Sequence, residues 1–155
     1  MPMEDVIMIS VPVTDQGRAL AFYVGKLGLT LSRVDESLPG VRRVQVTTSG
    51  TTTLSLVTWL ESMPAGCLYG VVFRSGDLQA DYERLAAAGV EFDGPPFAGP
   101  DGTCQAVFHD PDGNTLVLQA DVGPVTRHRS SRSVPASDRP PRGRPTGRMT
   151  CQMPG

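Results

Sequence analysis

The sequence predicts an α+β fold built from two copies of one β-α-β-β-β module. A repeat with a period near 62 residues relates "VPVTDQGRALAFYVGKLGLTLS" to "VVFRSGDLQADYERLAAAGVEFDG". In each copy an alternating apolar run ends at an Asp, and a helix-length amphipathic segment leads to a Gly. Short apolar segments separated by turn signals then follow. Because a module this small cannot cover its own sheet, the two copies must pack together.

The two helices are expected between Asp15 and Gly28 and between Asp77 and Gly89. An Asp at the N-cap accepts hydrogen bonds from free helix N–H groups, and a Gly supplies the left-handed residue that ends a helix. The apolar positions form one buried stripe on each helix. These stripes are Leu20, Phe22, Tyr23 and Leu27 on the first helix, and Tyr82, Leu85 and Ala86 on the second.

Each helix should follow one strand and precede three more. The later strands are expected near 29–35, 41–48 and 52–59 in the first copy and near 90–93, 103–109 and 114–120 in the second. Turn residues separate the last two strands of each copy, "SG" at 49–50 and "PDG" at 111–113. The segment "WLESMPAG", residues 59–66, is the expected crossover between the copies.

Charge and composition divide the chain into residues 1–121, with modules at about 5–60 and 67–120, and a tail at 122–155. The body holds seven Lys and Arg against fifteen Asp and Glu, a net charge of −8. The tail holds seven Arg and one acid, a net charge of +6, with six prolines and almost no large apolar residue. Such a composition predicts disorder. A basic arm raises the possibility of nucleic-acid binding, but no aromatic side chain interleaves the arginines, so we favour a solvated tail without a nucleic-acid partner.

The sequence is typical of a cytoplasmic protein. No stretch approaches the roughly 20 apolar residues of a membrane span, and the N-terminus lacks a basic segment of the secretory type. The three cysteines, Cys67, Cys104 and Cys151, are an odd number at wide spacing with no C-x-x-C pair. This pattern argues against a disulfide framework and a zinc knuckle, and for a reducing compartment.

The stretch "FHDPDGNTLVLQ", residues 108–119, concentrates polar residues between apolar runs. Asp110, Asp112 and Asn114 have the spacing of the first calcium ligands of an EF-hand. However, the glycine stands at the fourth position rather than the sixth, and no helices flank the segment. A tight turn is therefore the favoured interpretation.

Three other features have both functional and structural interpretations. His109 could act as a general base, but no nucleophile stands near it, so a surface or hydrogen-bonded histidine is favoured. Cys104 could line a ligand pocket or pack as a small apolar residue. Four aromatic residues could form a wall for a flat ligand or belong to the core and a dimer interface. These four are Trp59, Tyr69, Phe73 and Phe97.

Three features of the sequence are typical of one known family: the pair of modules, the segment "AFYVGKLGL" on the first helix, and the segment "DPDGNTLVLQ" on the last hairpin. With these features the chain resembles the vicinal oxygen chelate superfamily over roughly residues 5–120. That superfamily includes glyoxalase I, extradiol dioxygenases and bleomycin-binding resistance proteins. The resemblance implies eight strands in a cup-shaped mixed sheet. It also implies a homodimer whose pockets take residues from both chains.

The same resemblance locates the positions at which metal-using members place their ligands. The first-strand His corresponds to Met8, the fifth-strand His to Gly70 beside Tyr69, and the eighth-strand Glu to Val117. The fourth-strand ligand corresponds to Leu54 or Ser55. None of these residues carries the carboxylate or imidazole that a divalent ion needs, so no metal and no cofactor is expected.

These observations predict a metal-independent protein that binds a small organic molecule, with sequestration of an antibiotic or natural product as one form of this function. The alternative is a metal-free isomerase, lyase or cyclase that holds its substrate in a reactive conformation. A metal-dependent enzyme ranks third. The expected ligand-binding residues are Met8, Ser10, Ser55, Trp59, Tyr69, Gly70, Cys104 and Val117.

Overall fold

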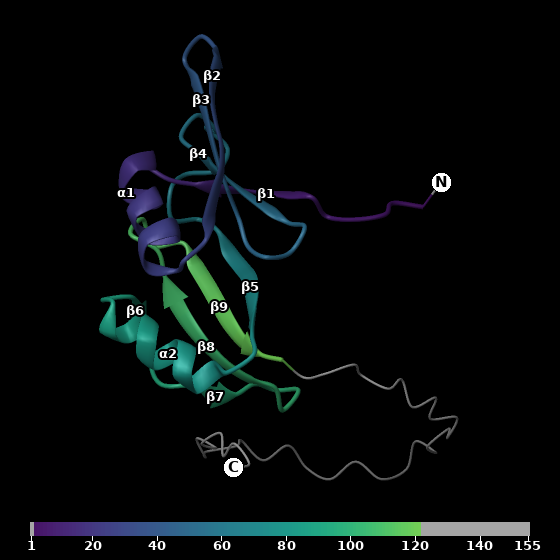
Figure 1. Cartoon of the computed structure of the whole chain (residues 1–155), viewed down its shortest axis with the longest axis vertical. Helices are drawn as coiled ribbons and strands as arrows, with labels where there is room; N and C mark the ends of the chain where they lie inside the picture. Colours follow the sequence, from purple (N-terminus) through teal and green to yellow (C-terminus); the bar gives the residue numbers. More distant parts are fainter. Residues whose placement is uncertain (1, 122–155) are drawn as a thin grey trace.

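A computed structural model describes residues 2–121 and confirms an α+β fold of two modules (Figure 1). The tail predicted to be disordered lies outside the described residues. The first module contains β1 (Met8–Pro12), α1 (Gln16–Leu20), the π-helical η1 (Ala21–Lys26), β2 (Thr30–Leu38), β3 (Val41–Thr47) and β4 (Thr53–Val57). The second contains β5 (Tyr69–Ser75), α2 (Leu78–Ala87), β6 (Glu91–Phe92), β7 (Phe97–Ala98), β8 (Cys104–His109) and β9 (Thr115–Ala120).

The strands form two separate mixed sheets, whereas the resemblance implies one eight-stranded sheet. The first has the order β1-β4-β3-β2, and the second has the order β5-β9-β8-β6 with β7 also paired to β8. In both sheets the first strand of the module pairs in parallel with the last. The edge strands β1 and β5 do not pair with each other within the described chain.

Both helices begin at the predicted aspartates. The carboxylate of Asp15 accepts a hydrogen bond from the N–H of Arg18, and that of Asp77 accepts one from the N–H of Ala80. The first helix then widens, because the N–H of Leu27 donates to the carbonyl of Phe22, five residues earlier, at 2.9 Å. No described helix is both long and apolar enough to cross a membrane.

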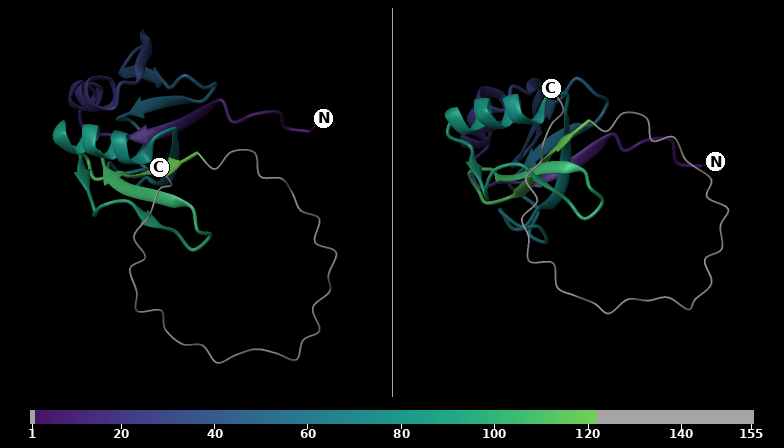
Figure 2. Two further views of the ribbon diagram at one scale, coloured as in Figure 1. Left: turned by 60° about the horizontal axis from the view of Figure 1, so that its bottom comes forward. Right: turned by 90° about the horizontal axis from the view of Figure 1, so that it is seen from below.

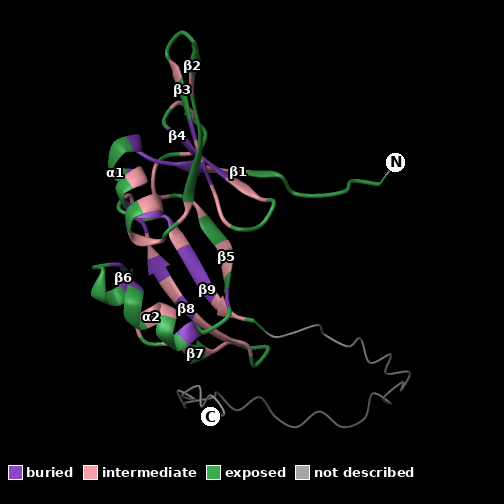
Figure 3. Ribbon diagram, in the orientation of Figure 1, coloured by how far each residue is buried: buried purple, intermediate pink, exposed green. Residues whose placement is uncertain are grey.

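One hydrophobic core joins the two modules. The ring of Phe22 in the first module lies 6.5 Å from that of Phe108 in the second, and Phe92 lies 5.5 Å from the same Phe108 ring. The helices lie on one side of the two sheets (Figure 2), and the purple, buried segments of Figure 3 follow the strands that they cover. The opposite face of each sheet, called the open face below, has no helix over it among the described residues.

Two strand boundaries differ from the sequence prediction in ways that matter for the site. The strand expected at 52–59 ends at Val57, so Trp59 lies in the connection that follows β4. The single strand expected at 90–93 is only two residues long, and a second short strand, β7, was not predicted. Two-residue strands are too short to produce a periodic pattern in the sequence.

Candidate functional site

Alternation along β1 and β4 separates the core side of the first sheet from its open face. Ile9 pairs with Leu54 and Val11 pairs with Leu56, and all four contribute to the core. Side chains of a strand point alternately to opposite faces of the sheet, so the pair Ser10 and Ser55 lies on the open face together with Met8. Of the two alternatives for the fourth-strand position, Ser55 is therefore on the open face and Leu54 is in the core.

The open face of the first sheet combines hydroxyl, amide and thioether groups. The side-chain amide of Gln45 on β3 donates to the sulfur of Met8 at 3.9 Å. Gln45 also pairs with Ser55 across the antiparallel β3–β4 ladder, so it belongs to the same face. Met8 is 45% exposed and Ser55 is 5% exposed. Gln45 was not identified from the sequence, although its alternation with the core residues Val44 and Val46 placed it on this face.

The open face of the second sheet is apolar around Val117. Val117 stands between the core residues Leu116 and Leu118, and it pairs with Val72 on β5 and Val107 on β8. Val72 is 52% exposed, whereas Val117 is 9% exposed. Val117, which the resemblance matches to a metal-binding Glu, thus has valines on both neighbouring strands.

Tyr69 and Gly70 lie where β5 departs from regular pairing. The register with β9 shifts between Tyr69 and Val71, and Gly70 has a φ of 93°. That conformation favours glycine, and a β-carbon added there would meet open space. Tyr69 is 78% exposed, the largest aromatic surface among the proposed ligand-binding positions.

Cys104 lies on the core side of its sheet, and Trp59 lies outside the strands. Cys104 alternates in phase with Ala106 and Phe108, and it packs against the core. This alternation places Cys104 on the core side of β8, and its contact with a ligand stays a prediction. Trp59 is half-buried in the connection after β4.

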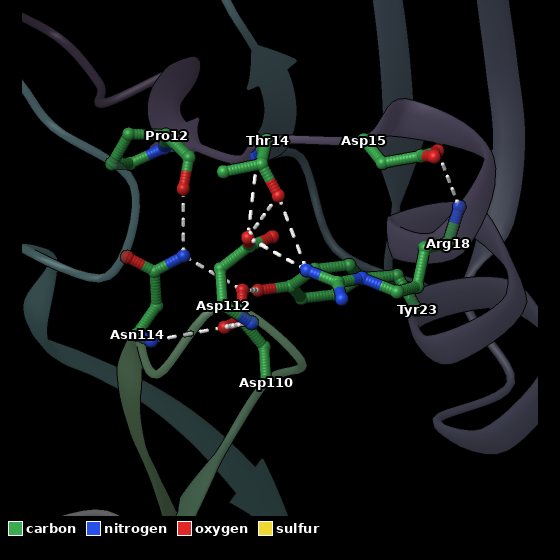
Figure 4. A network of polar contacts seen from close by, with 8 residues as sticks. All are labelled: Pro12, Thr14, Asp15, Arg18, Tyr23, Asp110, Asp112 and Asn114. Atoms are coloured by element: carbon green, nitrogen blue, oxygen red, sulfur yellow. Dashed lines mark hydrogen bonds and ion pairs between the residues drawn. The ribbon is translucent and has the colours of Figure 1, made fainter.

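The polar stretch 109–114 forms a turn that locks the two modules together (Figure 4). One carboxylate oxygen of Asp110 accepts the backbone N–H groups of Asp112 and Asn114, each at 2.9 Å. Its other oxygen accepts the hydroxyl of Tyr23 at 2.9 Å and the side-chain amide of Asn114 at 2.7 Å. That amide also donates to the carbonyl of Pro12 at 2.8 Å, so the turn is tied to the end of β1.

Asp112 extends this network to the first helix. A single carboxylate oxygen accepts hydrogen bonds from the Thr14 hydroxyl at 2.5 Å and from the Arg18 guanidinium at 3.0 Å. Three of the four carboxylate oxygens of Asp110 and Asp112 therefore have protein donors. Across residues 2–121 no three His, Cys, Asp or Glu side chains are grouped closely enough to hold a metal ion. The turn interpretation thus accounts for these aspartates, and the calcium interpretation has no ligand set.

Burial sets the chemistry of the tyrosine in this network. Tyr23 is fully buried, and desolvation raises the pKa of its phenol far above the usual value, with the charge of Asp110 acting in the same direction. The phenol therefore remains a neutral donor under ordinary conditions. Its role is to hold the turn against the first helix.

His109, on the open face of the second sheet, lies next to a carboxylate. It alternates with the core residue Phe108 and pairs with Thr115. Its Nε2 lies 2.6 Å from a carboxylate oxygen of Asp93, and its Nδ1 lies 3.3 Å from the hydroxyl of Thr115. The contact with Asp93 was not predicted, because 16 residues separate it from His109 in the sequence.

Comparisons with known proteins agree with this architecture. The sequence matches the Glyoxalase/Bleomycin resistance protein/Dioxygenase superfamily over residues 6–118. The structure of TnmS3, an antibiotic binding protein from Streptomyces sp. CB03234, is 40% identical in sequence with a TM-score of 0.70, covering 77% of this chain and 98% of that one. A superfamily member from Sphaerobacter thermophilus DSM 20745 is 31% identical with a TM-score of 0.71 and the same coverage.

A further relative has no described activity. The uncharacterized protein YetH of Bacillus subtilis (strain 168) is 31% identical over 114 residues, which is 72% of this chain and 93% of YetH. The match to the superfamily extends over nearly all described residues and includes both modules. The chain therefore belongs to the Glyoxalase/Bleomycin resistance protein/Dioxygenase superfamily.

Proposed function

We propose that this protein binds a small organic molecule on the open faces of its two sheets, without a metal ion, and sequesters it. The observation that carries the proposal is that the positions matched by the resemblance to metal ligands hold Met8, Ser55, Gly70 and Val117, none of which has a carboxylate or imidazole. The strand register supports a common face for Met8 and Ser55. A largely apolar surface with a few hydroxyl and amide groups is the usual chemistry of a small-molecule pocket.

The ligand class in this proposal is an antibiotic or a related natural product. TnmS3, a 40% identical relative, is described as an antibiotic binding protein. Met8 and Val72 suit a large organic ligand, since the flexible thioether of Met8 can adapt to an irregular shape and Val72 adds exposed apolar surface. Tyr69 supplies a flat surface at the margin of the same sheet.

The proposed pocket also requires a second copy of the chain. Each sheet ends in an unpaired edge strand, β1 or β5, and these edges carry exposed apolar residues. Ile7 is 68% exposed and Met8 45% beside one edge, while Tyr69 and Val72 are exposed on the other. A symmetric dimer would bury these surfaces and enclose the open faces.

A thermal-shift screen of antibiotics and natural products tests the binding function. A ligand present at 100 times its Kd should stabilise the protein by about 2.7 kcal/mol. The binding face is then tested with Val72→Arg, which adds a charge to the open face. Val34→Arg is the matched control, because Val34 is 47% exposed but pairs with the core residue Val44 on the helix side of its sheet.

The expected result is at least a tenfold weaker Kd for Val72→Arg and an unchanged Kd for Val34→Arg. Equal affinity of both variants and the parent protein would place the ligand elsewhere. Metal analysis of the purified protein should find no stoichiometric zinc, nickel, manganese or iron. A stoichiometric metal would contradict the metal-independent part of the proposal.

A second candidate function, metal-free catalysis, is favoured by the His109–Asp93 pair. A carboxylate 2.6 Å from one imidazole nitrogen can orient the ring so that the other nitrogen accepts a proton. Incubation of any bound compound with the protein, followed by mass spectrometry, separates the two functions. Catalysis predicts a product that disappears with His109→Gln, whereas sequestration predicts recovery of the unchanged compound.

A further inference from the structure

A row of polar side chains crosses the second sheet near the end of β9. Arg74 on β5 pairs with Gln119 on β9. Gln119 pairs in turn with Gln105 on β8, and Gln105 pairs with Phe97 on β7. Neighbouring strands lie about 4.8 Å apart, so the row is roughly 14 Å long. A guanidinium, two amides and an aromatic ring thus follow one another across four strands.

Alternation along the strands places this polar row on the open face. Arg74 stands between Phe73, which packs against the core, and Ser75, which donates to a side chain of α2. Gln119 and Gln105 each stand between two residues that belong to the core or pack against it. Successive side chains of a strand point to opposite faces, so the guanidinium and both amides point away from the helices.

The polar row has hydrogen-bonding capacity that the protein does not use. Arg74 is exposed, and Gln105 and Gln119 are half-buried. Within residues 2–121 none of these three side chains makes a hydrogen bond or an ion pair with another residue. A guanidinium carries five N–H donors, and each amide offers two donors and an acceptor. These groups are therefore available to a ligand on the open face.

An apolar row of three valines adjoins the polar row. Val72, Val117 and Val107 pair across β5, β9 and β8, and each lies two residues from a member of the polar row. Two residues of a strand cover about 6.7 Å, which is close to the length of two fused aromatic rings. A bicyclic ligand with a charged group at the polar row would therefore lie over the valines.

The opposite end of the same face is acidic. Glu91 pairs with His109 and lies on the same face, and the carboxylate of Asp93 is 2.6 Å from Nε2 of that histidine. His109 is four residues from Gln105 along β8, or about 13 Å. An anion is repelled by the carboxylates at this end and attracted by the guanidinium of Arg74 at the other. The charges of the face thus favour one orientation of an anionic ligand.

We propose that Arg74, Gln119 and Gln105 form a subsite that selects ligands in which a carboxylate is joined to an apolar body. The guanidinium would bind the carboxylate through charge-assisted hydrogen bonds, and the amides would donate to its oxygens or to a neighbouring carbonyl of the ligand. The apolar body would lie on the valine row. This inference rests on the binding function proposed for the open faces and narrows its ligand class.

Titration of the full chain with 2-naphthoate, followed by amide chemical shifts in NMR, tests this subsite. The neutral isostere 2-naphthalenemethanol is the matched ligand control. We expect 2-naphthoate to shift the amides of Val72, Val117 and Gln119, with at least tenfold weaker binding of the alcohol. Equal binding of the two compounds at these amides would overturn the subsite but leave the proposed binding function intact. Shifts confined to α2 or the first sheet, or no binding at millimolar concentration, would also overturn the subsite, and the antibiotic screen judges the binding function separately.

Substitution of the arginine supplies the second arm of the test. Arg74→Gln should weaken 2-naphthoate binding about tenfold and leave binding of the alcohol unchanged, because only the anion uses the charge. Arg42→Gln is the control, since Arg42 is another exposed strand arginine but alternates in phase with the core residue Val44, on the helix side. Amide spectra of both variants check that the fold is kept. Equal 2-naphthoate affinities of the two variants would overturn the assignment of Arg74.

Gln119→Glu tests the neighbouring amide. A carboxylate at this position would pair with Arg74 and compete with the ligand for the guanidinium. We expect weaker binding of 2-naphthoate by about tenfold and no change for the alcohol. An unchanged 2-naphthoate affinity would overturn the placement of the carboxylate between Arg74 and Gln119.

Discussion

Tyr23 and Asp110 form a buried contact across 87 residues of sequence, between the first helical segment and the last hairpin. The carboxylate accepts four hydrogen bonds, two from backbone N–H groups and two from side chains. Asp110 is 4% exposed, so an unsatisfied oxygen there would have no bulk water to replace a lost donor. This contact should therefore contribute more to the free energy of unfolding than a hydrogen bond on the surface does.

Tyr23→Phe should lower the free energy of unfolding by about 1–3 kcal/mol, since it leaves a buried charged acceptor with one donor fewer. Tyr82→Phe is the control. Tyr82 packs against Phe92 with ring centroids 4.8 Å apart, and its hydroxyl has no hydrogen-bond partner among the described residues. Urea denaturation of both variants gives the comparison, in which equal effects would contradict the role of the buried bond.

The same tyrosine predicts a pH dependence at the alkaline end. Burial raises the pKa of Tyr23 in the folded state, so its stabilising effect is complete below the unfolded value of 10.0 and declines as pH rises above it. The decline should approach about 1.4 kcal/mol per pH unit between the two pKa values. Denaturation at pH 9, 10 and 11 should show the stability advantage over Tyr23→Phe shrinking. A constant advantage would be the contrary result.

At the scale of single residues, the sequence predicted the turn but not its partners. Asp, Pro, Gly and Asn in "DPDGN" identify a turn from local backbone preferences. The contacts of Asp110 with Tyr23 and of His109 with Asp93 depend on tertiary packing, which one sequence does not display. The sequence left Leu54 and Ser55 as alternatives for the fourth-strand position. The pairing of Ser55 with Ser10 in the structure shows that Ser55 is the one on the open face.

Among the larger elements, the connection between the modules packs directly against the polar turn. Gly66 in this connection has a φ of 86°, and a β-carbon added there would collide with the backbone carbonyl of Asp112. The N–H of Leu68, two residues later, donates to the side-chain oxygen of Asn114 at 3.1 Å. The connection between the modules therefore packs closely against the turn at residues 110–114.

Gly66→Ala should destabilise the fold by about 3 kcal/mol or more, because backbone strain and a backbone collision act together. Gly40→Ala measures the strain alone. Gly40 has a φ of 75°, and a β-carbon added to it would meet nothing within 4 Å. The expected cost for that control is about 1–2 kcal/mol. Thermal or urea unfolding of the pair gives the difference, and a Gly66→Ala variant as stable as Gly40→Ala would contradict the packing described for the crossover.

Helices and strands were predicted correctly where the sequence pattern was local and repeated. Asp15 and Asp77 cap their helices as expected, since an Asp before an amphipathic run is a signal that needs no tertiary information. The π-helical turn around Phe22 and the short strand β7 were not predicted. Both arise from packing between segments, and neither produces a periodicity of its own.

For the whole molecule, the sequence predicted two packed modules but not the separation of their sheets. The repeat near 62 residues and the turn signals were sufficient for the module order. Which edge strands pair is decided by how the modules rotate against each other around Phe22, Phe108 and the turn of Asp110. In the described chain β1 and β5 are both edge strands with free hydrogen-bonding groups on one side. Such edges favour pairing with another chain.

A second copy of the chain is the expected partner of the edge strand β1. Val6 and Ile7 are 60% and 68% exposed in an extended segment that leads into the edge strand β1, so leaving them in water is unfavourable. Sedimentation equilibrium should give a mass of twice the 16.5 kDa chain. Replacing both residues with Asp should shift the protein to monomers, because two buried, unpaired charges per chain would oppose association.

Leu38→Asp is the control for this substitution, since Leu38 is 50% exposed on the β2–β3 hairpin and lies on neither edge strand β1 nor β5. That variant should remain dimeric. A parent protein that sediments as a monomer at all concentrations would refute the dimer, and with it the enclosure of the open faces by a second copy. Loss of ligand affinity in the Val6→Asp, Ile7→Asp variant, with the fold intact, would link the dimer to the binding site, because a face left half-open to water cannot desolvate an apolar ligand.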